Sequence, residues 1–205
     1  MIIKSAQLEA SAPTLAAAPA GALPEFAFIG RSNVGKSSLV NLLVERKDLA
    51  YVSATPGKTR LLNFFRINNT WRLVDLPGYG FAKGTKASRA DFNEAVADYI
   101  EQGPNVARVF VLIDGGLPPQ RIDIEFLRWL DGAEVPYSVV FTKADKIGRG
   151  KLLANKAQLQ RELAAAGVVM PESFAVSAKT RDGRRDLLAF IEGEIAAGQS
   201  GLPQF

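Results

Sequence analysis

Residues 30–37 read G-R-S-N-V-G-K-S, which fits the pattern G-x-x-x-x-G-K-[ST], and they constrain the fold of this chain most. The apolar residues 26–29 before this loop are predicted to be a strand, and residues 38–46 after it a helix. A glycine loop in that setting directs backbone N–H groups and a helix dipole at a phosphate. Lys36 is expected to reach β- and γ-phosphates, and Ser37 to offer its hydroxyl to Mg²⁺. The alternative, a glycine turn beside a surface lysine, is disfavoured by the flanking elements. We call residues 30–37 the P-loop.

The rest of the chain alternates between short apolar runs and segments with helical periodicity. Strands are predicted at residues 26–29, 61–67, 71–75, 109–114, 137–142 and 174–177. Helical periodicity recurs at 92–100, with Asp91 as the expected cap, and again at 122–130 and 188–195. Residues 10–24, rich in alanine and proline, are expected to be an irregular lead-in. This alternation predicts an α/β three-layer sandwich, with a mainly parallel central sheet and helices on both faces. Ligands of such sheets bind at the carboxyl ends of the strands.

The composition narrows the chemistry that the chain can perform. Its 205 residues are enough for one domain, and they include no cysteine and no histidine. Disulfides, thiolate zinc sites, iron–sulfur ligation, cysteine nucleophiles and imidazole catalysis are therefore excluded. Carboxylates, lysine, hydroxyls, backbone N–H groups and hard cations remain. The net charge of +4 is compatible with a polyanionic partner and equally with an ordinary soluble protein. No run approaches the roughly 18 apolar residues of a membrane span, so we expect no membrane contact and a cytoplasmic protein.

A second acidic motif follows the predicted strand at residues 71–75. Asp75 leaves that strand in the sequence D-L-P-G, where a carboxylate can hold Mg²⁺ through water. Gly78 offers an N–H that no side chain shields from a γ-phosphate. The alternative is a plain Pro-Gly turn, which the position 39 residues after Lys36 at a strand end disfavours. Thr59 or Thr55 can reach the same metal from the polar loop at 54–60, unless that loop is merely solvated.

Two further strings at strand ends suit recognition of guanine. Asp145, in T-K-A-D, can accept both the N1–H and the 2-amino group of that base. The aliphatic stem of Lys143 can lie along the ring, and the N–H of Ala178, in S-A-K, can donate to O6. Adenine offers no such pair of donors to Asp145. An ATP-using kinase is therefore the less favoured interpretation, and nucleotide competition would test it.

The five motifs together are similar to the GTPase domains of the translation-factor class. More narrowly, G-R-S-N-V-G-K-S-S-L, P-G-K-T and D-L-P-G-Y-G resemble the EngB (YihA/YsxC) family of bacterial GTP-binding proteins, of the TrmE–Era–EngA–EngB type. The resemblance implies a Ras-like P-loop GTPase fold in a single domain, with residues 24–197 as that domain. Residues 1–23 are expected to be a lead-in packed on it or preceding it, and residues 198–205 a frayed tail.

The resemblance also implies a function. It implies a GTPase that binds GTP or GDP with Mg²⁺, acts in assembly of the large ribosomal subunit and is required for normal cell division and septation. The expected partner is the large subunit or its precursor, with its rRNA and proteins, and the protein is expected to be a monomer. The implied nucleotide contacts are Gly30, Arg31, Ser32, Asn33, Val34, Gly35, Lys36, Ser37, Gly57, Lys58, Thr59, Arg60, Leu61, Asp75, Leu76, Pro77, Gly78, Thr142, Lys143, Ala144, Asp145, Phe174, Ala175, Val176, Ser177 and Ala178. The implied metal ligands are Ser37 and Thr59, with Asp75 acting through water.

The sequence departs from many GTPases at two positions of its motifs. Thr142 stands where many have Asn, as is typical of the EngB family. This threonine removes one amide that ties the base to the P-loop. Tyr79 stands where many small GTPases have a glutamine that orients the attacking water, so slow intrinsic hydrolysis is expected. Catalysis is then assigned to Lys36, Thr59 and Gly78. Asn33 is a possible K⁺ ligand, or else it hydrogen-bonds only within the loop.

Two interpretations of the function are compatible with this nucleotide site. One is a GTP-hydrolysing switch that binds a ribosomal particle, with basic residues as the contact surface. These residues are Lys83, Lys86, Arg89, Arg181, Arg184 and Arg185, and a merely solvated surface is the alternative interpretation. The other is a division-associated binding module in which GTP is structural, which would hold GTP without any partner affinity that depends on the γ-phosphate.

Overall fold

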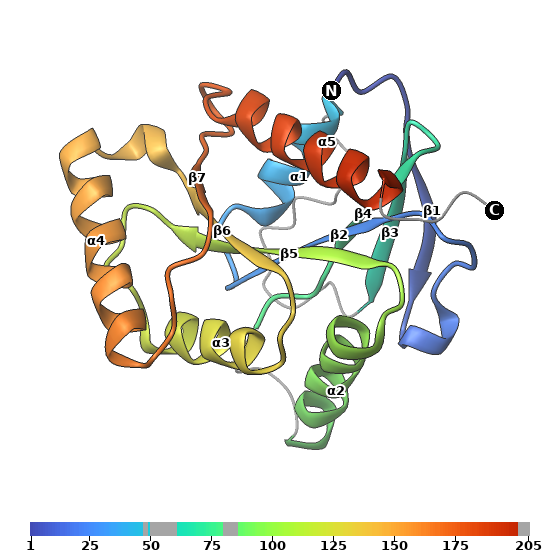
Figure 1. Ribbon diagram of the computed structural model, residues 1–205, viewed down its shortest axis with the longest axis horizontal. Helices are drawn as coiled ribbons and strands as arrows, with labels where there is room; N and C mark the ends of the chain where they lie inside the picture. Colours follow the sequence, from blue (N-terminus) through green and yellow to red (C-terminus); the bar gives the residue numbers. More distant parts are fainter. Residues whose placement is uncertain (47–48, 50–60, 80–85, 201–205) are drawn as a thin grey trace.

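The elements of the chain alternate between strands and helices, as predicted (Figure 1). The structure is a computed structural model, and it describes residues 1–46, 49, 61–79 and 86–200. In chain order the elements are β1 (Ala6–Ala12), the 3-10 turn η1 (Leu15–Ala17), β2 (Glu25–Gly30), α1 (Lys36–Val44), β3 (Leu62–Ile67), β4 (Trp71–Asp75), α2 (Lys86–Gln102), β5 (Val106–Asp114), α3 (Arg121–Gly132), β6 (Tyr137–Thr142), the 3-10 turn η2 (Ala144–Lys146), α4 (Arg149–Ala165), β7 (Ser173–Ala175) and α5 (Arg184–Ser200).

Seven strands form one sheet in the order β1-β3-β4-β2-β5-β6-β7. The pairs β1–β3 and β3–β4 are antiparallel, and every other pair is parallel. Near the carboxyl end of β2, Phe28 pairs with Asp75 of β4 and with Phe110 of β5. Because parallel strands end at the same edge of a sheet, the loops after β2, β4, β5 and β6 are brought together there.

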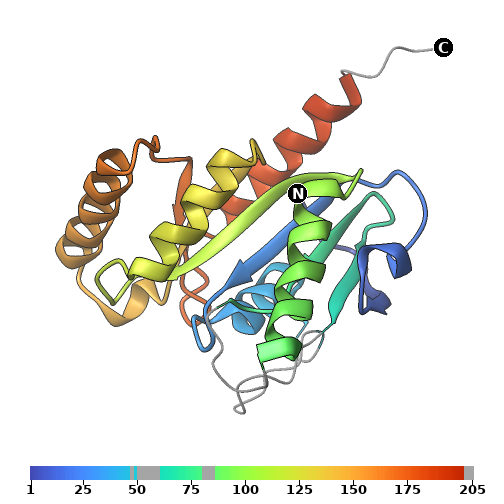
Figure 2. The same ribbon diagram turned by 90° about the horizontal axis from the view of Figure 1, so that it is seen from below.

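Helices cover both faces of this sheet, which confirms the predicted three-layer architecture (Figure 2). Along β2, Phe26 and Phe28 pack into the layer of α1 and α5, whereas Ala27 and Ile29 pack into the layer of α2, α3 and α4. This alternation follows from the two-residue period of a strand. All four side chains are fully buried, since burial of apolar surface on both faces stabilises a parallel sheet.

The N-terminal segment differs from the prediction. Residues 10–12, expected to be irregular, are the end of β1, which pairs antiparallel with β3 along one edge of the sheet. Only Ala6 and Ala12 of this strand are fully buried, and alanine does not produce a recognisable apolar run. The prolines lie beyond the strand, so the irregular part is shorter than expected. The division into lead-in, GTPase domain and tail stays a prediction.

Several boundaries also differ. Asp91 does not cap a helix, because α2 begins five residues earlier, at Lys86. α1 begins at Lys36 and β5 at Val106, and β7 is shorter than the predicted strand at 174–177. The tail was expected to fray from residue 198, but α5 continues to Ser200, and residues 201–205 lie outside the described part of the chain.

A buried ionic cluster attaches β1 to the rest of the sheet. Arg72 of β4 donates to Glu9 of β1 at 3.0 Å and to Glu25 of β2 at 3.1 Å, and Tyr99 donates to Glu25 at 2.9 Å. Hydrogen bonds from Arg66 and Arg72 lower the pKa of Glu9 to about 2, whereas burial raises the pKa of Glu25. The cluster therefore links the strands near the amino ends of β2 and β4, at the edge of the sheet opposite the predicted site.

Candidate nucleotide-binding site

The P-loop joins the end of β2 to the start of α1 and curls tightly. Asn33 (φ 63°) and Gly35 (φ 104°) have left-handed backbone conformations, and Gly35 is the residue before the first turn of α1. A Cβ at Gly30 would lie 2.7 Å from the Leu112 carbonyl oxygen of β5, so only glycine fits there. The N-terminus of α1 thus faces the carboxyl edge of the sheet, which is the geometry of an anion site.

Lys36 and Asp75 lie in direct contact at this edge. The Lys36 Nζ donates to Asp75 Oδ1, and both side chains are largely buried. The register of β2 against β4 places the end of β4 beside the P-loop, so the lysine and the acidic residue predicted for phosphate and metal come together. Ser37 follows in the first turn of α1. These are hard oxygen and ammonium groups, which suit phosphate and Mg²⁺.

The D-L-P-G segment packs directly against the P-loop. The Leu76 N–H donates to the Phe28 carbonyl at 3.0 Å, which extends the pairing of β4 with β2. A Cβ at Gly78 would lie 2.5 Å from the Gly30 carbonyl oxygen, so the backbone approaches as closely as only glycine allows. The side chain of the next residue, Tyr79, packs against α3. Its hydroxyl donates to Asp123 at 2.8 Å, and its ring stacks on Phe126 with centroids 4.4 Å apart.

The T-K-A-D segment is tied to the P-loop by two side chains. The Thr142 hydroxyl donates to the Val34 carbonyl at 2.6 Å. Lys143, with a left-handed φ of 58°, donates to the Asn33 carbonyl at 2.8 Å and to Asp114 Oδ2 at 2.7 Å. The amide that Thr142 removes is thus replaced by other links, because the Thr142 hydroxyl and Lys143 both bond to backbone carbonyls of the P-loop.

Asp145 is exposed, and Ser177 orients it. The Ser177 hydroxyl donates to Asp145 Oδ1 at 2.7 Å, and this hydrogen bond lowers the pKa of the carboxyl group. The same oxygen of Ser177 accepts from the N–H groups of Lys179 at 3.2 Å and Thr180 at 3.0 Å. Ser177 is itself fully buried. Sequence reasoning assigned it only as a nucleotide contact and missed this orienting hydrogen bond.

Several of the remaining predicted contacts differ in where they lie. Phe174 and Val176 pack into the core beside α5, so only their backbone groups can reach a base. Leu61 is partly exposed just before β3. Gly57, Lys58, Thr59 and Arg60, with Thr55, lie outside the described residues.

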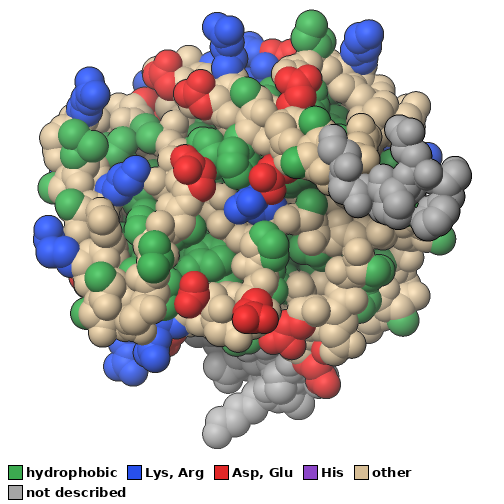
Figure 3. Space-filling model, in the orientation of Figure 1, with side chains coloured by type: hydrophobic (Ala, Val, Ile, Leu, Met, Phe, Trp, Pro, Cys, Tyr) green, Lys and Arg blue, Asp and Glu red, His purple; other side chains and the backbone are tan. Residues whose placement is uncertain are grey.

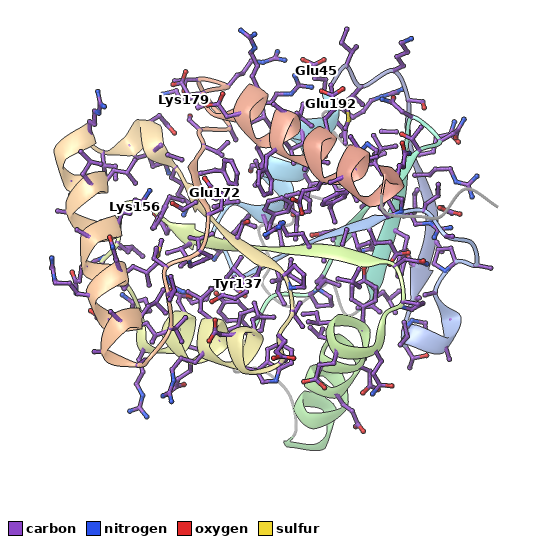
Figure 4. All side chains as sticks on the ribbon, in the orientation of Figure 1. Glu45, Tyr137, Lys156, Glu172, Lys179 and Glu192 are labelled. Atoms are coloured by element: carbon purple, nitrogen blue, oxygen red, sulfur yellow. The ribbon has the colours of Figure 1, made fainter. Side chains whose placement is uncertain are left out.

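Two of the predicted basic contacts also bond within the molecule. Arg184 donates to the carbonyls of Leu42 and Leu43 at 2.9 and 2.8 Å, at the end of α1, and Arg181 pairs with Glu45. Glu45 Oε1 also lies 3.6 Å from Nη1 of Arg184, in the first turn of α5 (Figure 4). Arg185 is exposed in the same turn. Lys83 lies outside the described residues, and only the backbone of α2 is described at residues 86 and 89.

Arg31 and Asp123 form an ion pair that the sequence did not suggest. Arg31 Nε lies 3.0 Å from Asp123 Oδ1, between the P-loop and the first turn of α3. The two residues are 92 positions apart, and no motif joins them. Among the described residues, no group of three or more acidic side chains forms a metal cluster, and none of the described helices is long and apolar enough to cross a membrane.

Comparison with known proteins agrees with this geometry. Residues 25–143 match a family model described as 50S ribosome-binding GTPase. A probable GTP-binding protein EngB of Bacteroides fragilis is 47% identical over 94% of this chain and 96% of its own length, and its counterpart in Flavobacterium johnsoniae is 44% identical over 98% of both chains. The chain belongs to the EngB family of GTP-binding proteins. It is therefore a P-loop GTPase by family, as its motifs suggested.

Solved structures share the same fold. The crystal structure of a probable EngB is 26% identical to this chain, covers 84% of it and 99% of its own chain, and has a TM-score of 0.67. Era of Aquifex aeolicus, in a structure with GDP and AlF₄⁻, is 24% identical, covers 83% of this chain and 56% of its own, and also has a TM-score of 0.67. The likeness to Era is one of fold. Both confirm the P-loop GTPase architecture.

Proposed function

We propose that this EngB-family protein is a slow GTPase whose GTP-bound state acts in assembly of the large ribosomal subunit. The observation that carries the proposal is the meeting of four loops at one edge of the sheet, with the P-loop in contact with both the D-L-P-G and T-K-A-D segments. The family model described as 50S ribosome-binding GTPase supports the choice of partner. A requirement for normal cell division and septation would follow from that role, in the cytoplasm and as a monomer.

Guanine is the proposed base. Asp145 is exposed and held by Ser177, so its carboxylate is available to accept a pair of N–H donors. A carboxyl group of this kind is ionised at neutral pH, and the hydrogen bond from Ser177 lowers its pKa further. The Asp145→Asn variant should lose affinity for guanine nucleotides and gain affinity for xanthine nucleotides, because the donor and acceptor pattern at that edge is reversed. An Asp145→Asn protein that still prefers GTP to XTP would refute the assignment of the base.

Mg²⁺ is the proposed metal, held by Ser37 and Thr59 with Asp75 acting through water. The hydroxyl of Ser37 in the first turn of α1 and the carboxylate of Asp75 at the end of β4 are hard oxygen donors, and such donors fit this cation. When bound, the ion neutralises phosphate charge. Lys36 is proposed to exchange its contact with Asp75 for the β- and γ-phosphates. Gly78 is proposed to donate its N–H to the γ-phosphate.

Slow intrinsic hydrolysis is proposed from the position of Tyr79. Its hydroxyl donates to a buried carboxylate and its ring is packed on Phe126, so the residue after Gly78 does not reach an attacking water. Asn33 is the candidate contributor from the P-loop, through a K⁺ ion near the phosphates. Its side chain is exposed, and its backbone carbonyl accepts from Lys143. A ribosomal particle is the other candidate activator.

The partner is tested by co-sedimentation with purified ribosomal subunits. The protein loaded with a non-hydrolysable GTP analogue should sediment with the large subunit, and the GDP-loaded protein should remain largely in the supernatant. On the face drawn in Figure 3, Lys and Arg side chains are interspersed with Asp and Glu, so affinity that follows the nucleotide rather than bulk charge is expected. Equal sedimentation with both nucleotides would favour a binding module in which GTP is structural.

A further inference from the structure

Three side chains that come from different parts of the chain meet beside the P-loop. Arg31 belongs to the P-loop, Tyr79 follows the D-L-P-G segment, and Asp123 lies in the first turn of α3. Asp123 Oδ1 accepts from the Arg31 Nε at 3.0 Å and from the Tyr79 hydroxyl at 2.8 Å. The Asp123 side chain is completely buried. One buried oxygen therefore links the two loops that face the proposed γ-phosphate.

The two carboxylate oxygens of Asp123 differ in their hydrogen bonds. The other oxygen of Asp123, Oδ2, is buried and has no hydrogen-bond partner among the residues that the structure describes. Burial raises the pKa of Asp123, although Tyr79 and Arg31 oppose the shift. A buried carboxylate with one incompletely paired oxygen costs folding free energy, and an apolar residue would fill the same place without that cost. The arrangement therefore favours a role in fixing the geometry of its partners over a role in stability.

The geometry that it fixes is that of Gly78. The backbone of Gly78 packs on the P-loop so closely that a Cβ would lie 2.5 Å from the Gly30 carbonyl oxygen. The next residue, Tyr79, is anchored by its hydrogen bond to Asp123 and by its stacking on Phe126. Gly78 is thus held by the P-loop on one side and, through Tyr79, by Asp123 on the other.

We propose that Asp123 is a positioning residue that acts through Tyr79 to keep Gly78 against the P-loop, and so lets the protein distinguish GTP from GDP. Arg31 holds the carboxylate from the side of the P-loop, so the distance between the two loops is set through one shared oxygen. The inference rests on the proposed function, in which only the γ-phosphate uses the Gly78 N–H. Without the bond from Tyr79 to Asp123, GTP has to fix the backbone at Gly78 when it binds, whereas GDP does not.

The test uses Tyr79→Phe, Asp123→Leu and the double variant in the full chain. Tyr79→Phe removes the hydroxyl and keeps the ring on Phe126, so it remains informative even if Asp123→Leu folds poorly. Dissociation constants are measured for GDP and for the β,γ-imido analogue of GTP, both with Mg²⁺. Each single variant should bind the analogue about tenfold more weakly, the size of a lost hydrogen bond to a charged group, and GDP within about twofold of the unmodified protein. The double variant should lose no more than Asp123→Leu alone, because Tyr79→Phe removes only the bond to Asp123, which Asp123→Leu has already removed.

Tyr99→Phe is the matched control. It removes another buried hydrogen bond from a tyrosine to a carboxylate, the 2.9 Å contact with Glu25, at the opposite end of β2. It should lower stability and leave the ratio of the two affinities unchanged. The proposal is overturned if the ratio stays the same in Tyr79→Phe, if both affinities fall alike, or if the effects of the two substitutions add. Failure of the unmodified protein to bind either guanine nucleotide would instead refute the proposed function.

Discussion

The hydroxyl of Thr142 should stabilise both the fold and the bound nucleotide, and Thr142→Val tests this. The hydroxyl donates to the Val34 carbonyl at 2.6 Å, and both residues are buried, at 4% and 3% exposure. Valine has nearly the same shape but cannot donate, so the substitution leaves a buried carbonyl of the P-loop without this donor. A lost hydrogen bond and an unsatisfied buried acceptor together cost about 2 kcal/mol.

The assay is urea unfolding followed by circular dichroism, without nucleotide. A loss of about 2 kcal/mol should lower the midpoint with little change in slope, and should lower the melting temperature by about 6 °C for a chain of this size. Thr142→Ser is the control, because it keeps the hydroxyl and loses one methyl group, at a cost of about 1 kcal/mol. The GDP affinity of the valine variant should also fall, since the P-loop backbone is less firmly held.

Two results would refute this reasoning. If Thr142→Val is as stable as the unmodified protein, the hydroxyl contributes nothing to the fold. If the valine variant is less stable but binds GDP as tightly as the unmodified protein, the link to the P-loop has no part in nucleotide binding.

Four further outcomes are expected. Ser37→Ala should make GTP binding nearly insensitive to the removal of Mg²⁺ by EDTA, measured by titration, and an unchanged Mg²⁺ dependence would contradict the metal assignment. GTP turnover should be faster in K⁺ than in Na⁺ at equal ionic strength, and Asn33→Ala should reduce the difference; equal rates in the unmodified protein would leave Asn33 without this role. The lowered pKa of Glu9, about 2 against 4.5, means that its ion pairs stabilise the fold above pH 4.5 and that this stability is lost as the pH falls toward 2. Glu9→Gln should therefore cost about 2 kcal/mol at pH 7 and progressively less in acid, measured by unfolding at each pH. Gly183→Ala should lower the free energy of unfolding by more than about 3 kcal/mol, because φ is +74° and a Cβ would lie 2.0 Å from the Ala175 carbonyl oxygen. Gly167→Ala is the control, because φ is also positive, at +80°, but a Cβ there would meet open space. It should cost about 1 kcal/mol in the same unfolding measurement.

The parts of the site that local sequence specifies could be predicted. The P-loop, the D-L-P-G segment and the T-K-A-D segment each follow an apolar strand, and the parallel sheet then brings their ends to one edge. Strand period and glycine conformation act over a few residues, so the sequence displays them directly. The antiparallel edge strand β1 was missed because its buried positions, Ala6 and Ala12, are small and carry little apolar signal.

The contacts between loops could not be predicted from the sequence. The Arg31–Asp123 pair spans 92 positions and the Ser177–Asp145 pair spans 32, and no periodicity encodes either distance. The contact of the Thr142 hydroxyl could not be predicted either, because the loss of an amide says nothing of the hydroxyl that replaces it. The fold decides whether that hydroxyl reaches the Val34 carbonyl.

The two side-chain contacts from the T-K-A-D segment to the P-loop share a direction that matters for phosphate binding. Thr142 and Lys143 both bond to carbonyl groups of the P-loop, those of Val34 and Asn33. In a planar trans peptide the carbonyl and the following N–H point in opposite directions. Holding the Val34 carbonyl toward the T-K-A-D segment therefore directs the N–H of Gly35 away from that segment. The segment that we propose to recognise guanine thus also sets the backbone that we propose to hold the phosphates.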